Sequence, residues 1–268
     1  YANSNREDVI RSNGQIFYSQ VLGQPHSPFL RHAVNILAQS SKMGESLSPF
    51  MHSGCVQGVI KTMRFLLESG KADFVFSTEI GNSVWNASED VALEKRRQKL
   101  AFFDCLHCLA NLATHTAGIH RADGGFNAEY DCPVIQERIS YTALQRDARI
   151  DYRGKPLKKS LLDNSYVVRL FAHSACLDML TYLMRDTKSL NVARHVLRTL
   201  YGLACSGAMK AIVGDMVMHG GKNLIRVLEL VEESDPTVSS LSMCLLLQCT
   251  TLDYARSQLF YCRIPHLL

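Results

Sequence analysis

One arrangement of turns and helices recurs along this 268-residue chain, and it limits the available folds more than any other feature. Each unit begins with a turn of small residues or glycine, continues with an apolar helix, and ends in a longer helix near a Leu-Ala pair. The residues that directly follow the turns are Gln15, Cys55, Cys176 and Lys222, which are 40, 121 and 46 positions apart. Spacings of about 40 to 47 residues are typical of helical repeats that stack into a solenoid. The spacing of 121 is too long for one unit, so we predict two insertions, at 71–94 and 117–160.

The apolar residues of these units follow a helical period. One example is the set Val56, Val59, Ile60, Met63, Leu66 and Leu67, which places apolar side chains on one face of a helix. Asp235 followed by Pro236 predicts a helix N-terminus, because Asp accepts amide hydrogen bonds there and Pro fits the first turn. No run of 18 apolar residues is present that would predict a membrane-spanning helix. The sequence therefore predicts an all-α fold.

Several stretches resemble the armadillo repeat. Residues 5–14 resemble the family's first helix and glycine turn, 209–231 resemble its first and second helices, and 234–238 resemble the start of the third. Residues 264–268 resemble the start of another second helix, so we expect the chain to be part of a longer protein. HEAT repeats are a close alternative, but the glycine turns favour armadillo. The resemblance implies a single armadillo-like α-solenoid over 1–268, with approximate repeats 1–40, 41–116, 117–207, 208–253 and an incomplete 254–268.

The resemblance also suggests where a binding groove would lie. In armadillo proteins that bind extended basic peptides, each third helix carries a Trp and, four residues later, an Asn. Aligned on the helix ends, the Trp positions are His32, His107, Arg198 and Cys244, and the Asn positions are Ile36, Asn111, Gly202 and Gln248. Only Asn111 keeps the family residue, and the single tryptophan, Trp85, lies in an insertion. These differences argue against binding of nuclear-import cargo.

Polar side chains at helical spacing indicate a groove of another kind. Asp104, His107 and Asn111 lie at i, i+3 and i+7 of one predicted helix, and Arg194 and Arg198 at i and i+4 of another. They are interpreted either as solvated helix faces or as an acceptor site for an acidic or polar segment of a partner, anchored by the two arginines. The candidate protein-binding residues are His32, Asp104, His107, Asn111, Arg194, Arg198 and Gln248.

The two insertions have separate interpretations. Segment 71–94 contains Phe74, Phe76 and Trp85 and is too apolar for a free linker, so we expect it to pack on the solenoid or on a partner. Segment 117–160 is interpreted either as a flexible surface loop or as a docking arm, because long loops are usually functional or disordered.

A metal site is the one chemical alternative that the cysteines suggest. Cys105 and Cys108, followed by His115 and His120, have a spacing that superficially resembles a zinc site. The two cysteines lie within a predicted apolar helix and no second Cys-x-x-Cys exists, so we predict buried core thiols. No phosphate-binding loop, dinucleotide motif or catalytic signature is present. We therefore expect no enzymatic activity, no cofactor and no metal.

The sequence is most consistent with a protein-interaction scaffold or adaptor. We expect it to be a cytoplasmic subunit of a large assembly, of the cytoskeletal or ciliary kind, with other proteins as its partners and no small-molecule substrate or membrane insertion. The alternative is an RNA-binding helical repeat in a ribonucleoprotein, suggested by the basic run at 95–99. A net charge of +4 and a pI of about 8.6 are low for a dedicated nucleic-acid binder.

Overall fold

The computed structural model describes residues 14–24, 27–43, 50, 53–69, 72, 75–76, 89–117, 171–172, 175–206, 209–219 and 221–261. Within these residues the regular elements are helices and no strand occurs, which confirms the prediction of an all-α fold. Trp85, residues 118–160 and most of the segment 71–94 lie outside the described residues, so the predictions for them stay predictions.

The helices follow one another along the whole described chain. They are α2 (Gly14–Leu22), α3 (Leu30–Ser40), α5 (Cys55–Glu68), α6 (Glu89–Thr116), α10 (Cys176–Asp186), α11 (Leu190–Cys205), α12 (Lys210–His219), α13 (Lys222–Val231), α14 (Pro236–Cys249) and α15 (Asp253–Tyr261). The helix predicted from the apolar period at 56–67 corresponds to α5. Because α6 begins at Glu89, the last residues of the predicted insertion 71–94 are helical.

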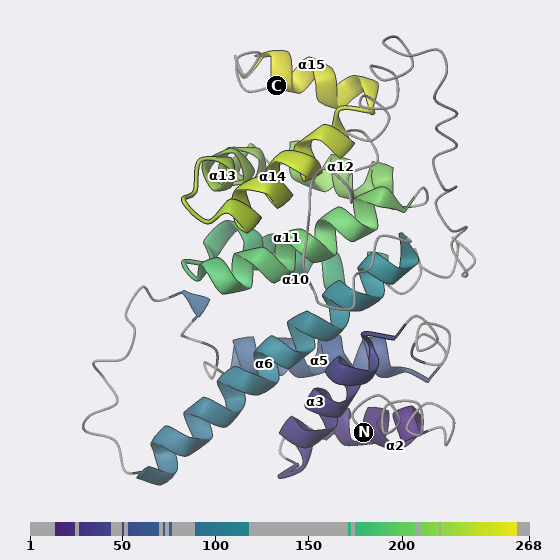
Figure 1. Cartoon of the computed structure of the whole chain (residues 1–268), viewed down its shortest axis with the longest axis vertical. Coiled ribbons are helices and arrows are strands. Elements are labelled where there is room, and N and C mark those ends of the chain that lie inside the picture. The colour runs from purple at the N-terminus through teal and green to yellow at the C-terminus, as the bar shows by residue number, and fades with distance from the viewer. Residues whose placement is uncertain are drawn as a thin grey trace, which may run out of the picture.

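Four of these helices pack on one another in chain order (Figure 1). From the lower part of the view to the upper part, α6 packs on α3, α11 on α6, and α14 on α11. Each of the four also packs on the helix that comes before it in the chain, namely α2, α5, α10 or α13. These eight helices thus form two layers whose apolar faces meet in one continuous core, while α12 packs against α11, α13 and α14, and α15 packs against α12.

A short piece of the segment 71–94 packs against α10. The Thr187 hydroxyl and the Lys188 amide both donate to the carbonyl of Val75, at 2.9 and 3.1 Å. The rings of Phe76 and Tyr182 lie 5.4 Å apart. Val75 itself is fully buried. For these two residues, the expectation that the segment packs on the helices is met.

The turns before α5, α10 and α13 each contain a residue with positive φ. Gly54, Ala175 and Gly221 precede these helices with φ values of 78°, 55° and 47°. They are the residues of the described chain with positive φ. Glycine adopts this conformation without strain, whereas the Cβ of Ala175 makes it costly. The ψ values are 6° and 21° at Gly54 and Ala175 but −60° at Gly221, so the first two turns have similar local geometry and the third shares only the positive φ.

A similar joint forms at each step of the four-helix layer. The Asn111 amide of α6 donates to the carbonyl of Ala38 in α3 at 3.4 Å, and the Gln248 amide of α14 donates to the carbonyl of Ala204 in α11 at the same distance. Between them, Gly202 of α11 meets Ala113 of α6 so closely that a Cβ would lie 2.8 Å from the carbonyl carbon. The residues that make these contacts, Asn111, Gly202 and Gln248, are the ones that the sequence alignment places at the Asn position of the armadillo repeat. We call these three contacts the helix joints.

Candidate functional site

A group of polar side chains lies where α6 packs on α11. Asp104 and His107 come from α6, and Arg194, His195 and Arg198 come from α11. Helical spacing brings each set to one side of its helix, and the packing of α6 on α11 brings the two sets together. We call these five residues the polar cluster.

The centre of the polar cluster is a pair of histidines. The rings of His107 and His195 are 4.1 Å apart and meet edge to face at 75°. The ring of Phe103 covers His195 from another side, at 6.4 Å. Nδ1 of His195 is buried and accepts no hydrogen bond from the described residues. The pair is therefore enclosed mainly by other rings.

The surroundings of the histidines keep them neutral. Burial, followed by the nearby His107, Arg198 and Arg194, lowers the pKa of His195 to about 3. Burial and the Arg198 charge also lower the pKa of His107. At neutral pH the pair carries no charge, and a histidine whose pKa is about 3 is a poor general base. The positive charge of the polar cluster resides on its arginines.

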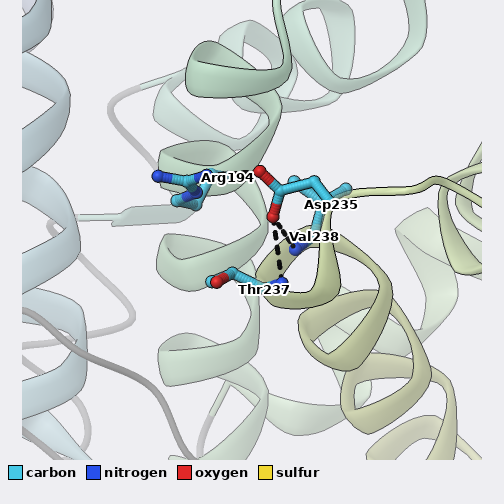
Figure 2. Close-up of polar contacts among 4 residues, drawn as sticks. All are labelled: Arg194, Asp235, Thr237 and Val238. Carbon is cyan, nitrogen blue, oxygen red and sulfur yellow. Dashed lines mark hydrogen bonds and ion pairs between the residues drawn. The ribbon is translucent and has the colours of Figure 1, made fainter.

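Arg194 pairs with the residue that caps α14 (Figure 2). One carboxylate oxygen of Asp235 forms an ion pair with Arg194, while the other accepts the amides of Thr237 and Val238 at 2.9 and 3.0 Å. Burial acts to raise the pKa of Asp235, but the Val238, Arg194 and Thr237 hydrogen bonds together hold it below its usual value. Asp235 therefore stays ionised and links α11 to the start of α14. The Arg194 side chain nevertheless remains 38% exposed.

Asp104 connects the polar cluster to α3. It accepts a hydrogen bond from the Asn35 amide at 3.1 Å. Burial raises the pKa of Asp104, and the Asn35 hydrogen bond and the charges of Arg31 and Lys42 oppose this rise. A half-buried carboxylate with cations on one side can exchange its partners with those of a bound protein. The polar surface thus extends across three helices.

The seven residues predicted from the sequence divide into two groups. Asn111, Arg198 and Gln248 are buried, with exposures of 2%, 5% and 5%. Asn111 and Gln248 make helix joints, and Asn111 also donates to the Ser41 hydroxyl at 3.0 Å. The other four, His32, Asp104, His107 and Arg194, keep part of their surface accessible.

The sequence did not identify three further polar residues of this surface. His195 follows Arg194 directly, but a single histidine in a helix gives no signal of its own. Asn35 is 69 residues away from its partner Asp104 in the sequence, and Asp235 is 41 residues away from its partner Arg194. Asp235 was predicted as a helix cap, and it fulfils that role as well.

The described residues contain no group of three His, Cys, Asp or Glu side chains arranged to hold a metal ion. Cys105 and Cys108 are fully buried among apolar side chains, which confirms the prediction of core thiols. Burial raises the pKa of both thiols well above their ordinary value. Protonated, buried thiols are poor metal ligands and poor nucleophiles. His120, the most distant member of the superficial zinc pattern, lies outside the described residues.

Comparison with models of protein families, with curated proteins and with solved structures finds no match to this chain. Among the helices of the described residues, none combines the length and the apolar character needed to cross a membrane.

Proposed function

We propose that this protein is a non-catalytic scaffold for protein–protein interactions, built as an armadillo-like stack of helical repeats. The observation that carries the proposal is the recurrence of the helix joints. Equivalent positions in α6, α11 and α14 meet the same part of the preceding helix at three successive steps. Repetition of one packing unit is the property that defines repeat proteins, whose extended surfaces bind other proteins. The residues with positive φ before α5, α10 and α13 support the same arrangement.

The surface that would bind a partner is the accessible part of the polar cluster together with Asn35. Arg194 is its anchor, because its side chain is 38% exposed and its guanidinium already pairs with one carboxylate, that of Asp235. Arginine matches carboxylates with two parallel hydrogen bonds, so it suits an acidic or polar segment of a partner. The neutral histidines and Phe103 provide flat surfaces beside this charge. The expected partner is therefore a protein that presents an acidic segment.

The scaffold is further proposed to act in the cytoplasm as a subunit of a large assembly of the cytoskeletal or ciliary kind. The support is analogy, since stacked helical repeats with long additional segments are common in such assemblies. Co-sedimentation of the protein with a large complex from a lysate is expected. Recovery of the protein only as a small free species would contradict this extension.

Affinity purification of the tagged protein, followed by mass spectrometry, tests the proposal. We expect a fixed set of partners that survives nuclease treatment and is lost from the variant Arg194→Gln. The matched control is Arg185→Gln, since Arg185 is also a half-exposed, ion-paired arginine, but it lies on α10 outside the polar cluster. Thermal unfolding of both variants shows whether either change unfolds the protein.

Two outcomes would refute the proposal. Loss of the partners on nuclease treatment would favour the alternative function, a subunit that binds RNA. Equal loss of partners from the Arg185→Gln and Arg194→Gln variants, with both proteins folded, would show that the polar cluster is not the binding surface.

A further inference from the structure

A second candidate surface lies along the first half of α6, beside the polar cluster. The start of α3, the end of α5 and the first half of α6 enclose a cavity of about 310 Å³. Its apolar lining includes Leu30, Leu66 and Ala101, which are almost fully buried. Its polar lining includes Arg31, Glu94 and Arg97. Phe65 also lines the cavity, which thus has an apolar floor and a charged rim.

Exposed apolar side chains gather around this cavity. Phe29 is 67% exposed and stands between two residues of the lining, while Val91 and Leu93 are each 47% exposed. Val91 lies one helical turn before Glu94, and Leu93 one turn before Arg97, so the two flank the lined side of α6 on opposite edges. These three are among only five large hydrophobic side chains that the described residues leave exposed. Such clustering is typical of interaction sites.

The charges of the rim favour an anionic ligand. Glu94 accepts a hydrogen bond from Gln98 at 2.9 Å and lies 3.9 Å from Arg97, so its charge is partly satisfied on its own helix. Arg97 remains 54% exposed, and Arg31 supplies a second guanidinium from α3. A carboxylate at this rim therefore meets more positive than negative charge.

We propose that this cavity is a docking site for a segment of a partner protein that inserts one large apolar side chain and presents a carboxylate beside it. The apolar side chain packs on Leu30, Leu66 and Ala101, and the carboxylate pairs with Arg31 or Arg97. The volume of about 310 Å³ suits one large side chain, because it lies at the lower end of the range of roughly 300–1,000 Å³ for ligand pockets. The site adjoins the polar cluster, because the charge of Arg31 also acts on Asp104, but the proposal does not rest on the function proposed for that cluster.

A protein segment fits this site better than a nucleic acid does. Single-stranded nucleic acids bind on aromatic faces, on which successive bases stack. Here the lining formed by the described residues holds one aromatic side chain, Phe65, among Leu30, Leu66 and Ala101, and it presents no row of aromatic faces on which successive bases could stack. Arg97, which belongs to the basic run 95–99 that suggested RNA binding from the sequence alone, is therefore assigned to recognition of carboxylates.

Binding of small probes to the full chain, followed by NMR of labelled methyl groups, tests the site. The probe is 3-phenylpropionate, which carries a ring and a carboxylate. Its matched controls are phenethylamine, which has a similar ring with a positive charge, and propionate, which has no ring. We expect 3-phenylpropionate to shift the methyl signals of Leu30 and Leu66 and to bind at least about fivefold more tightly than either control. The methyl groups of Leu230, in α13, serve as the distant reference.

Two variants on the same turn of α6 test the role of charge. Arg97→Gln is expected to reduce the preference for the carboxylate over the amine to less than about twofold, because it removes a guanidinium from the rim. Arg96→Gln is the control, since Arg96 is exposed but does not line the cavity. It should leave the preference unchanged.

Short random peptides selected on the wild-type protein should pair an aromatic residue or Leu with Asp or Glu, and should bind Arg97→Gln weakly.

Three results would overturn the proposal. Equal affinity for 3-phenylpropionate and phenethylamine would show that the rim does not select charge. Tighter binding of uridine monophosphate at the same methyl groups would assign the site to nucleic acid. Self-association in sedimentation that Phe29→Asp abolishes would show that a second copy of this chain covers the cavity.

Discussion

Replacing His195 by Phe should make the stability of the protein less sensitive to acid. His195 lies on α11 between Arg194 and Arg198, and its ring contacts His107 and Phe103 of α6. Its burial and the neighbouring His107, Arg198 and Arg194 hold its pKa at about 3. In the unfolded chain the same histidine has a pKa of about 6.5. Above pH 6.5 neither state binds the proton, so stability does not depend on this group. Between pH 6.5 and about pH 3 only the unfolded chain binds it, so the folded state loses stability as the pH falls.

The size of this loss follows from the two pKa values. At pH 5 the proton stabilises the unfolded chain by about 2 kcal/mol, relative to pH 7, because the pH is then about 1.5 units below the unfolded pKa. Partial contact of His195 with water reduces the effect, so we expect about 1–2 kcal/mol. A phenylalanine keeps a ring against His107 and binds no proton. The difference in unfolding free energy between pH 7 and pH 5 should therefore shrink by about 1–2 kcal/mol in His195→Phe.

Urea unfolding followed by circular dichroism at both pH values measures this difference. The comparison uses each protein's own change with pH, so a change in packing that is equal at both pH values cancels. His32→Phe is the control, because His32 is an exposed histidine on α3. It should keep the acid sensitivity of the wild-type protein. An acid sensitivity of His195→Phe within about 0.5 kcal/mol of the wild type would refute the reasoning.

Three further predictions concern the turns, the helix joints and the thiols. Gly54→Ala should destabilise the protein by about 1 kcal/mol through backbone strain alone, since no atom lies within 4 Å of the new Cβ. Ala175→Gly removes such strain and should stabilise the protein by up to about 1 kcal/mol. Urea unfolding measures both changes, and changes of the same sign would contradict this reasoning. Gly202→Ala should cost about 1–3 kcal/mol, because the new Cβ would lie 2.8 Å from the carbonyl carbon of Ala113; a loss below about 0.5 kcal/mol would show that the helices separate easily. Burial raises the pKa of the Cys176 thiol to about 12. Iodoacetamide at pH 8 should therefore modify Cys176 at least about 100-fold more slowly in the native protein than in urea. Mass spectrometry measures the two rates, and equal rates would contradict the burial of this thiol.

The helices could be predicted from the sequence because their signals are local. The apolar period of α5 and the Asp235–Pro236 start of α14 each involve residues within a few positions of one another. The turn at Gly54 is equally local, since it depends on the one residue type that adopts a left-handed backbone without strain. The turn at Ala175 was found only through its spacing from the others, because alanine carries no such signal.

The polar cluster could be predicted only in part, because its contacts join distant positions. A helical period shows that Asp104, His107 and Asn111 share one side of a helix, but not which neighbour covers each of them. In the structure Asn111 bonds to the end of α3 and is buried, whereas Asp104 and His107 lie farther toward the start of α6 and stay partly accessible. The pairing of Arg194 with Asp235 depends on how α11 packs on α14, which no local pattern reveals.

The helix joints have a consequence for how this chain tolerates changes in length. The joint between Ala38 and Asn111 spans 73 positions of sequence, whereas the equivalent joint between Ala204 and Gln248 spans 44. Each joint uses only residues of the two helices that it connects, so additional chain between them leaves it intact. The entropic cost of closing a longer loop grows only with the logarithm of its length. Segments between the helices can therefore be lengthened, shortened or exchanged for a new recognition sequence while the geometry of the stack is conserved.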